Sequence, residues 1–463
     1  MSRKFLIATF GCRTNQADSD ALREALKSRS FQETDRAREA DLIVVNSCTV
    51  THRSDQQVRQ MTRRLLRENP EAKVFVTGCY AQRDPAAMSK IPGVAAVVGN
   101  SRKHELVELA AAEEAVPPTE NELARLYLDD FKKTRSMELT PSIEIGGKTR
   151  PFVKIQDGCD AKCTYCIIPS VRGPSRSAPV QQILGHVQRL VRIGFREIVL
   201  TGIHIGTYGT YLQPRCPLDE LLKRILEVPG LGQVRISSIE PMALSERIIE
   251  LAAAEPRIAP HFHICLQSGS DSVLKRMLRP YNASRFGSIV ERVRNRLPHA
   301  AIGTDLIAGF PGETSAEHRE TVRFVSQLPF TYLHVFPYSD RSGTIASEMN
   351  GKVRNRTIRR RAAELRAISE DKNRRFRESF MGQSLRFLTL TEVRDGHRSG
   401  ISGNYLKVQT DPKIPANQLE EGTVIGASGE FLRVSVLRSC QDSSPLQPSA
   451  FPEFDSRTTT DTA

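Results

Sequence analysis

Short apolar runs alternate with amphipathic stretches along the first 100 residues of the chain. The runs are rich in β-branched residues and end at turn-forming residues, which is typical of buried strands. They are Phe5–Phe10, Leu42–Val45, Lys73–Thr77 and Val94–Val98. Apolar residues at helical spacing separate them, as in Asp18–Leu26 and Asp55–Leu66. This alternation predicts an α/β fold, with a doubly wound parallel sheet in an N-terminal domain of residues 1–115.

A longer series of strand–helix units follows. The periodicity fades over residues 116–144, which we interpret as a linker with a short helix around Glu122–Phe131. Residues 145–377 then contain six predicted strands, separated by helical patterns such as Val180–Ile193 and Ser284–Leu297. The strands are Phe152–Ile155, Glu197–Leu200, Val234–Ser237, His263–Leu266, Ile302–Ile307 and Tyr332–Phe336. Six units favour an open (β/α)6 barrel, although periodicity alone does not exclude a flat sheet.

The pattern changes again near the C-terminus. Lys352–Arg377 has an apolar stripe at helical spacing, which predicts one long helix. Short strands with turn signals between Gln383 and Leu437 predict a small all-β barrel over residues 378–440. Residues 441–463 are rich in Ser, Thr, Pro and Asp, and we expect them to be disordered.

The charge of the chain suggests a polyanionic partner. Lys and Arg number 66 against 53 Asp and Glu, giving a net charge of +13 over 463 residues. Much of the excess lies in the helix Lys352–Arg377, whose face is either merely solvated or contacts phosphates. Its surface arginines are predicted to be Arg354, Arg356, Arg359, Arg360, Arg361, Arg374, Arg375 and Arg377. No signal peptide or membrane-spanning run is evident, so we expect a cytoplasmic protein.

The sharpest chemical signal is a CxxxCxxC motif directly after a predicted strand. It contains Cys159, Cys163 and Cys166. A structural zinc site needs four protein ligands, and no histidine near these cysteines in the sequence supplies the fourth. Three thiolates on a cube-shaped iron–sulfur cluster leave one iron open for chemistry. An incomplete zinc knuckle, or a chance grouping of cysteines, is the alternative.

A second set of three cysteines is scattered in the sequence but regular in context. Cys12, Cys48 and Cys79 each follow a predicted strand of the N-terminal sheet. The carboxyl ends of parallel strands share one edge, so these thiols are expected to converge on a second cluster. Any one of them alone would be read as a structural cysteine. Cys216 and Cys440 lack such a context, and we regard both as incidental.

The CxxxCxxC motif, with Tyr165 before its last cysteine, resembles the signature of the radical S-adenosylmethionine (SAM) superfamily. The flanks of both cysteine sets resemble the methylthiotransferases of that superfamily, over residues 3 to 440. The resemblance implies two 4Fe–4S clusters, a radical SAM partial barrel and a C-terminal TRAM domain that binds RNA. It also implies that the open iron binds SAM and that reductive cleavage releases a 5′-deoxyadenosyl radical. The matching segments are Gly11–Gln16, Asn46–Thr51, Thr77–Gln82 and Cys166–Ser177.

Within this family the chain is most similar to the branch that acts on threonylcarbamoyladenosine at position 37 of tRNA, in the anticodon loop. The alternatives are isopentenyladenosine at the same position, a ribosomal-protein aspartate, or a non-catalytic iron–sulfur RNA-binding sensor. Two residues depart from the family pattern, Cys265 in place of a proline and Ala178 in place of a frequent basic residue. The branch assignment depends on Thr49–Thr51, Leu200–Gly206, Ser237–Pro241 and His334–Ser339.

Polar residues and glycines near the carboxyl ends of the barrel strands are candidates for the SAM site. The resemblance implies that some of them hold the methionine, ribose and adenine of SAM; for each taken singly, ordinary turn chemistry is the alternative. The candidates are Gly202, Glu240, Gln267 and Asp305. The reaction implied is methylthiolation of C2 of the modified adenosine. The electron donor and the sulfur source are not indicated.

Overall fold

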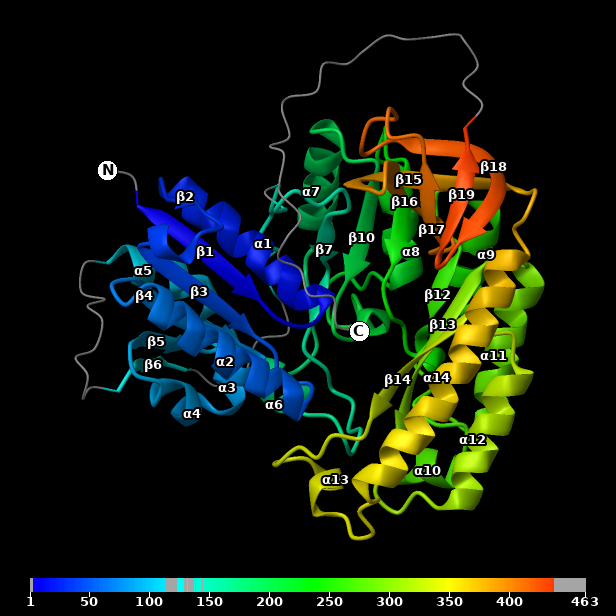
Figure 1. Cartoon of the computed structure of the whole chain (residues 1–463), viewed down its shortest axis with the longest axis horizontal. Coiled ribbons are helices and arrows are strands. Elements are labelled where there is room, and N and C mark those ends of the chain that lie inside the picture. The colour runs from blue at the N-terminus through cyan, green and yellow to red at the C-terminus, as the bar shows by residue number, and fades with distance from the viewer. Residues whose placement is uncertain are drawn as a thin grey trace.

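The computed structural model describes residues 3–112, 123–128, 131, 137, 139–143 and 145–436. The tail 441–463 and Cys440 lie outside these ranges. Three units follow one another along the chain: a parallel sheet domain, a strand–helix barrel and a small all-β barrel (Figure 1). Among the described helices, none combines the length and apolar character needed to cross a bilayer.

The N-terminal unit is a six-stranded parallel sheet in the order β2-β1-β3-β4-β5-β6. Along β3, Ile43 and Val45 pack into the apolar cluster on one face, while Leu42 and Val44 pack into the cluster on the other. Helices therefore cover both faces, which confirms the predicted doubly wound sheet. The strands are β1 (Lys4–Thr9), β2 (Gln32–Glu33), β3 (Leu42–Ser47), β4 (Lys73–Gly78), β5 (Val94–Val98) and β6 (Arg125–Tyr127). The helices are α1 (Arg13–Ser28), α2 (His52–Glu68), α3 (Cys79–Arg83), α4 (Pro85–Ser89) and α5 (Leu106–Ala111).

The second unit is a partial barrel of six parallel strands, in the order β7-β10-β11-β12-β13-β14. Single bridges from Val234 to Ile258 and from Ile239 to Ile264 join its two three-stranded halves. This arrangement confirms the open barrel. Its strands are β7 (Phe152–Lys154), β10 (Glu197–Thr201), β11 (Gln233–Ile236), β12 (His261–His263), β13 (Ala301–Ala308) and β14 (Tyr332–Pro337), and β8 (Gln156–Asp157) pairs separately with β9 (Arg176–Ser177). Its helices are α6 (Ile168–Arg172), α7 (Val180–Arg192), α8 (Leu218–Leu226), α9 (Glu246–Ala254), α10 (Asp271–Arg276), α11 (Ala283–Arg296), α12 (Ser315–Gln327) and α13 (Ile345–Glu348).

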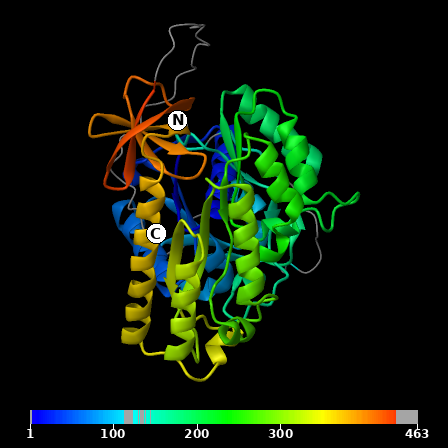
Figure 2. The same ribbon diagram turned by 90° about the vertical axis from the view of Figure 1, so that its right-hand side faces the viewer.

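A long helix connects this barrel to the third unit. Helix α14 (Asn355–Glu378) packs on β13 and β14 and leads into a closed five-stranded barrel (Figure 2). The closed barrel confirms the all-β C-terminal unit, and its form is that of a TRAM-like domain. Its strands are β15 (Ser384–Arg394), β16 (His397–Ser402), β17 (Lys407–Thr410), β18 (Leu419–Ser428) and β19 (Phe431–Ser435).

Two local predictions were wrong. The helix expected around Glu122–Phe131 is not present among the described residues there, because Arg125–Tyr127 form the edge strand β6 against Ala96–Val98. Strand pairing with the sheet outweighs the local helical tendency of this segment. The strand predicted at His263–Leu266 begins two residues earlier and ends at His263. The domain boundaries stay predictions, although β6 extends the N-terminal sheet into the expected linker.

Candidate metal centres

Cys12, Cys48 and Cys79 stand at one edge of the N-terminal sheet. They follow β1, β3 and β4, which are adjacent strands. A Cβ atom on Gly11 would lie 2.7 Å from the Cβ and Sγ of Cys48, and Gly11 has a φ of +94°. Only glycine fits such a close approach at this backbone angle. The loop that carries Cys12 is therefore brought directly against Cys48.

Buried donors surround this cysteine set. Arg172 Nε donates to Cys79 Sγ at 3.3 Å, and Asn100 Nδ2 donates to the same sulfur at 3.6 Å. Burial, together with the nearby Cys79 and Cys12, raises the pKa of the Cys48 thiol to about 12. A thiol with this pKa stays protonated until a cation replaces the proton, as a bound metal does. The donor set therefore fits thiolates on a metal centre.

Arg172 connects the two large units. Its side chain is 1% exposed, although it is charged. Its Nη1 donates to both carboxylate oxygens of Asp157 at 2.9 and 3.0 Å, and its Nη2 donates to Asp18 Oδ2 at 3.1 Å and to Asn15. Burial alone would lower the pKa of Arg172, but Asp157, Cys79 and Asp18 raise it well above its ordinary value. The guanidinium is therefore a permanent positive charge beside Cys79.

Cys159, Cys163 and Cys166 lie on the loop between β8 and α6. Arg279 Nη1 donates to Cys163 Sγ at 3.2 Å, and the backbone N–H of Ala161 donates to Cys159 Sγ at 3.4 Å. Burial raises the pKa of Cys159 to about 11 and that of Cys166 to about 12. The thiols of Cys159 and Cys166 therefore need a cation to ionise, and donors from the loop and from Arg279 reach two of the three sulfurs.

The two cysteine sets meet across the domain interface. Helix α6 begins two residues after Cys166, and its Ile168 and Val171 pack with Cys79 in one small apolar cluster. The Nδ2 of Asn100, which donates to Cys79, also donates to the backbone oxygen of Val171 at 2.9 Å. The same short helix therefore connects the CxxxCxxC loop to the second set.

Neither set has the compactness of a one-ion site. Ligands of one zinc ion lie at most about 4.6 Å apart, which is twice the longest Zn–S bond. Among the described residues, the single group of three ligand atoms within 4.8 Å of one another is His263, Asp305 and His334, which contains no cysteine. Cysteines on separate irons of a cube stand further apart, so the spacing fits a cluster better than zinc.

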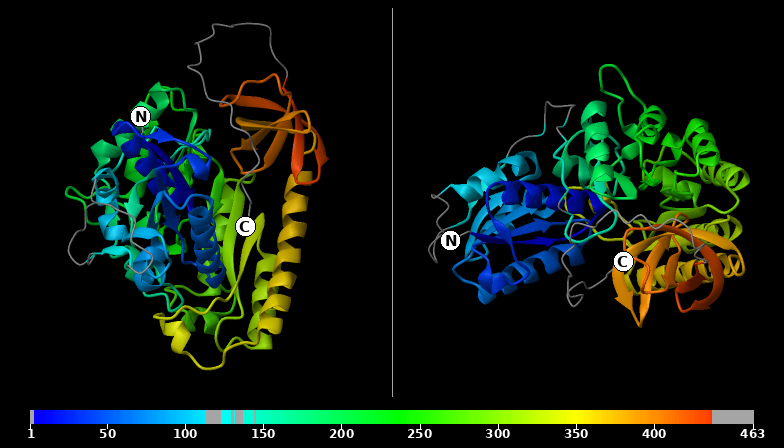
Figure 3. Two further views of the ribbon diagram at one scale, coloured as in Figure 1. Left: turned by 60° about the vertical axis from the view of Figure 1, so that its left-hand side comes forward. Right: turned by 90° about the horizontal axis from the view of Figure 1, so that it is seen from above.

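The N-terminal domain closes the open side of the partial barrel (Figure 3). Helix α1 packs on the edge strand β7, where Lys154 pairs with Asp18. At the opposite edge, after β14, Arg341 Nη1 donates to Asp55 Oδ2 at 2.6 Å. Arg13, the residue after Cys12, donates to the hydroxyl oxygen of Tyr405 in the C-terminal barrel at 2.9 Å. The N-terminal unit therefore contacts both of the other units.

The four candidate SAM residues belong to four different strand–helix units of the central barrel. Gly202 follows β10, and a Cβ atom there would lie 2.9 Å from the backbone oxygen of Gln156. Glu240 follows β11 and pairs with Arg279, the residue that contacts Cys163. Gln267 follows β12 with a φ of +73°. Asp305 lies within β13 rather than past its end. Gly202 is thus placed beside Gln156, just before the CxxxCxxC loop, and Glu240 is placed beside Arg279, which contacts that loop. The backbone N–H of Gln267 donates to the backbone oxygen of Asp305 at 2.8 Å.

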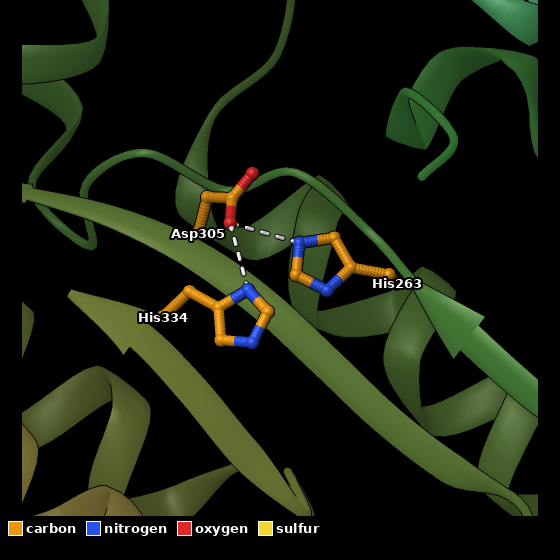
Figure 4. Close-up of side chains that lie close together, drawn as sticks. All are labelled: His263, Asp305 and His334. Atoms are coloured by element: carbon orange, nitrogen blue, oxygen red, sulfur yellow. Dashed lines mark ion pairs between the residues drawn. The ribbon is translucent and has the colours of Figure 1, made fainter. Parts of the chain in front are cut away.

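His263, Asp305 and His334 project from three adjacent strands to a common point (Figure 4). His263 Nε2 lies 2.9 Å and His334 Nδ1 lies 3.5 Å from the same oxygen, Asp305 Oδ1. Burial would raise the pKa of Asp305, but the two imidazoles lower it overall. Two imidazoles and a carboxylate are able to hold a transition-metal ion or to bind an anion through the imidazoles.

The two departures from the family pattern have structural explanations. The Cys265 thiol donates to Asp305 Oδ2 at 3.7 Å, so this residue supports the carboxylate of the His–Asp–His group. Ala178 is fully buried, and its backbone oxygen accepts a hydrogen bond from Tyr208 at 3.0 Å. A basic side chain at Ala178 would have to displace core residues.

Sequence reasoning missed several residues beside the cysteines. His204 Nδ1 lies 3.7 Å from Cys159 Sγ, so a histidine does stand near that motif in space although none is near it in the sequence. The fold brings it there from the end of β10, within the segment Leu200–Gly206. Arg279 and Asn100 gave no sequence signal. Arg361 was predicted on the basic surface but is 4% exposed and pairs with Glu313 at 2.8 Å.

Comparisons with known proteins agree with this architecture. Residues 4–99 match the uncharacterized protein family UPF0004, and residues 153–325 match the radical SAM superfamily. The chain is 36% identical over 391 residues to the threonylcarbamoyladenosine tRNA methylthiotransferase MtaB of Aquifex aeolicus, covering 84% of this chain and 94% of that one. This chain belongs to the radical SAM methylthiotransferase family. It is therefore an enzyme, and its superfamily uses an iron–sulfur cluster and SAM.

Other relatives extend the comparison. The Bacillus subtilis MtaB is 35% identical, covering 86% of this chain and 88% of that one. The tRNA-2-methylthio-N(6)-dimethylallyladenosine synthase of Aquifex aeolicus is 33% identical, covering 76% of this chain and 80% of that one. Among solved structures, the radical SAM methyltransferase TsrM of Kitasatospora setae, with cobalamin and a 4Fe–4S cluster bound, has a TM-score of 0.55. At 17% identity, covering 75% of this chain and 77% of that one, it shows a shared fold only.

Proposed function

We propose that this enzyme transfers a methylthio group to C2 of N6-threonylcarbamoyladenosine at position 37 of tRNA, giving 2-methylthio-N6-threonylcarbamoyladenosine. The observation that carries the proposal is the meeting of two cysteine sets, joined through α6 and Cys79, where the N-terminal and central units pack together. Two adjacent thiol sets suit a reaction that needs both a radical and a sulfur atom. The C2–H bond of adenine is unactivated, so proton transfer alone does not break it.

Six cysteines are proposed to hold two 4Fe–4S clusters. Cys159, Cys163 and Cys166 hold one, and Cys12, Cys48 and Cys79 hold the other. When bound, these clusters supply the electron that cleaves SAM and the sulfur atom that is transferred. Arg279 and Arg172 donate hydrogen bonds to one sulfur of each set, which stabilises the thiolates. Gly202, Glu240, Gln267 and Asp305 are proposed to border SAM, with Asp305 at the inner limit of that site.

The substrate assignment follows the comparisons. Aquifex aeolicus has both kinds of tRNA enzyme, and the identity and the coverage of this chain are higher for its threonylcarbamoyladenosine enzyme than for its dimethylallyladenosine enzyme. Threonylcarbamoyladenosine is therefore the proposed base, and isopentenyladenosine is the second candidate. With tRNA as its substrate, the enzyme is proposed to act in the cytoplasm. The exposed arginines of α14, among them Arg359 and Arg360, are proposed to contact RNA phosphates.

Mass spectrometry of tRNA nucleosides tests the substrate. A deletion strain should lose 2-methylthio-N6-threonylcarbamoyladenosine and keep the unmethylthiolated nucleoside, and the gene should restore the product. Loss of the isopentenyl derivative instead would contradict the assignment.

Purified variants test the cluster ligands. Cys163→Ala should abolish SAM cleavage and product while tRNA binding persists. Cys163→Ala and Cys79→Ala should each remove about four of about eight irons, because each set holds one four-iron cluster. Cys216→Ala is the matched control, since this thiol is buried in the main apolar core of the central barrel, which contains none of the six cysteines, and should retain full iron. Product formed by Cys163→Ala, or an unchanged iron content in Cys79→Ala, would contradict the ligand assignments.

A further inference from the structure

Chains of contacts lead from the His263–Asp305–His334 group toward both cysteine sets. On one side, Arg279 contacts both Cys163 Sγ, at 3.2 Å, and the backbone oxygen of Cys265, at 3.4 Å. Cys265 Sγ then donates to Asp305. A substrate base that meets a radical from one set and sulfur from the other must occupy the space between them, so side chains facing that space are placed to contact it.

A second line of contacts runs from the same group toward Cys12. The rings of His334 and Tyr332 lie 4.9 Å apart, and Tyr332 Oη lies 2.8 Å from His261 Nε2. His261 stacks on Tyr405 at 4.6 Å, and Tyr405 accepts a hydrogen bond from Arg13. The group is therefore fixed in position from both sides.

The three side chains differ in access. The side chain of His263 is 6% exposed, and its Nδ1 lies 3.1 Å from Tyr332 Oη. Asp305 is 22% exposed and its oxygens face His263, His334 and Cys265. The side chain of His334 is 54% exposed. Within the described part of the chain, therefore, His334 is the member of this group that a ligand can reach.

The orientation of His334 defines what it can bind. Its Nδ1 lies 3.5 Å from Asp305 Oδ1, so that nitrogen faces the carboxylate. A protonated imidazole donates from both ring nitrogens, so an anion bound at Nε2 is held by the protonated ring. Nε2 lies on the side of the ring away from Asp305 (Figure 4) and has no hydrogen-bond partner among the described residues. An imidazolium N–H directed at open space is a donor for an anionic acceptor.

We propose that His334 binds the carboxylate of the threonylcarbamoyl group on the substrate base, and that Asp305 is a positioning residue that orients it. The inference rests on the proposed function, because it takes the substrate base from it. A dimethylallyl group has neither charge nor acceptor, so it gains nothing from this contact. The contact therefore selects the anionic base, whereas the basic face of α14 contacts phosphates of any sequence.

The test compares the affinity for two anticodon stem-loops that differ only in the threonylcarbamoyl group of adenosine 37. Fluorescence anisotropy with cluster-loaded enzyme gives the dissociation constant of each and hence their ratio. The wild type should prefer the modified loop. His334→Phe should reduce this preference by about 10- to 100-fold, the value of one hydrogen bond to a charged group. His334→Gln, which keeps an N–H donor without charge, should be intermediate, and Asp305→Asn should also lower the preference.

Several controls separate recognition from folding. His104→Phe makes the same change at an exposed histidine of the N-terminal domain and should keep the wild-type ratio. SAM cleavage without RNA should be unchanged in His334→Phe. An equal ratio of the two dissociation constants in the wild type and in His334→Phe would overturn the proposal. If that unchanged ratio were accompanied by a zinc or iron ion that the wild type binds stoichiometrically and His334→Phe does not, the group would be a metal site instead. A wild type that binds selectively but forms no methylthio product would instead contradict the proposed function.

Discussion

Arg172 Nε lies 3.3 Å from Cys79 Sγ, although 93 residues separate the two along the chain. Arg172 belongs to the helix after the CxxxCxxC loop, and Cys79 begins the helix after β4. The contact places the positive end of a largely buried ion network against Cys79 of one set. The helix that carries Arg172 begins two residues after Cys166 of the other set. One side chain thus joins the interface between domains to the proposed chemistry.

Removing Arg172 should destabilise the interface strongly. Arg172→Leu leaves Asp157 and Asp18 buried with fewer positive partners, at a cost of about 3–5 kcal/mol in the free energy of unfolding. Urea titration followed by circular dichroism measures this change. Arg374→Leu is the control, because Arg374 is 52% exposed and its ion pairs among the described residues are with Asp371 and Glu378 on its own helix; its cost should stay below about 1 kcal/mol. Equal effects of the two changes would contradict the proposed importance of the buried network.

Arg235 should hold the C-terminal barrel against the central one. It pairs with Glu197 at 2.8 Å, both side chains being fully buried, and donates to the backbone oxygens of Ser402 and Gly403 at 3.0 and 2.7 Å. Arg235→Met should cost about 3–5 kcal/mol by leaving the buried Glu197 with only the longer 3.8 Å pair to Arg150. The double variant Arg235→Met with Glu197→Leu should regain that stability, yet limited proteolysis should still release the C-terminal barrel faster than in the wild type. A proteolysis rate unchanged from the wild type would show that these contacts do not hold the domain.

His186 should make the stability of the central barrel depend on pH. Burial lowers the pKa of this histidine to about 4, and its buried Nδ1 has no hydrogen-bond partner within the part of the chain that the structure describes. Because the folded pKa lies below the unfolded value, the stability is complete above about pH 6.5 and falls as the pH drops toward 4. The slope reaches about 1.4 kcal/mol per pH unit. The midpoint of unfolding should depend less on pH between 6.5 and 4 in His186→Leu than in the wild type. An unchanged slope of the midpoint against pH would contradict this assignment.

The exposed arginines of α14 should contribute affinity for RNA without base preference. Reversing Arg359 and Arg360 to Glu should weaken tRNA binding. The slope of log K against log salt should also fall by about 0.7–0.9 for each phosphate that the variant no longer neutralises. Filter binding over a salt series measures both quantities. The selectivity between the two anticodon stem-loops should not change, which distinguishes this surface from His334. An unaltered salt slope would show that the helix face is only solvated.

The sequence by itself determined the order of the three units along the chain. It also identified the six cysteines as candidate ligands of metal clusters. Strand runs such as Leu42–Val45 are legible because each residue is buried on one face of the sheet or the other, which leaves a continuous apolar run. The convergence of Cys12, Cys48 and Cys79 was predictable from topology alone, since parallel strands end at one edge.

The tertiary structure decided which distant side chains meet. The spacing of these residues along the sequence has no periodicity that would predict their contacts. The pairs are Arg172 with Cys79, Arg279 with Cys163, and Arg13 with Tyr405. The burial of Arg361 and the edge strand at Arg125–Tyr127 likewise depend on neighbours from elsewhere in the fold. Local patterning records which face of an element is buried, but it does not record what that face is buried against. The residues that recognise a ligand between domains are therefore set by packing.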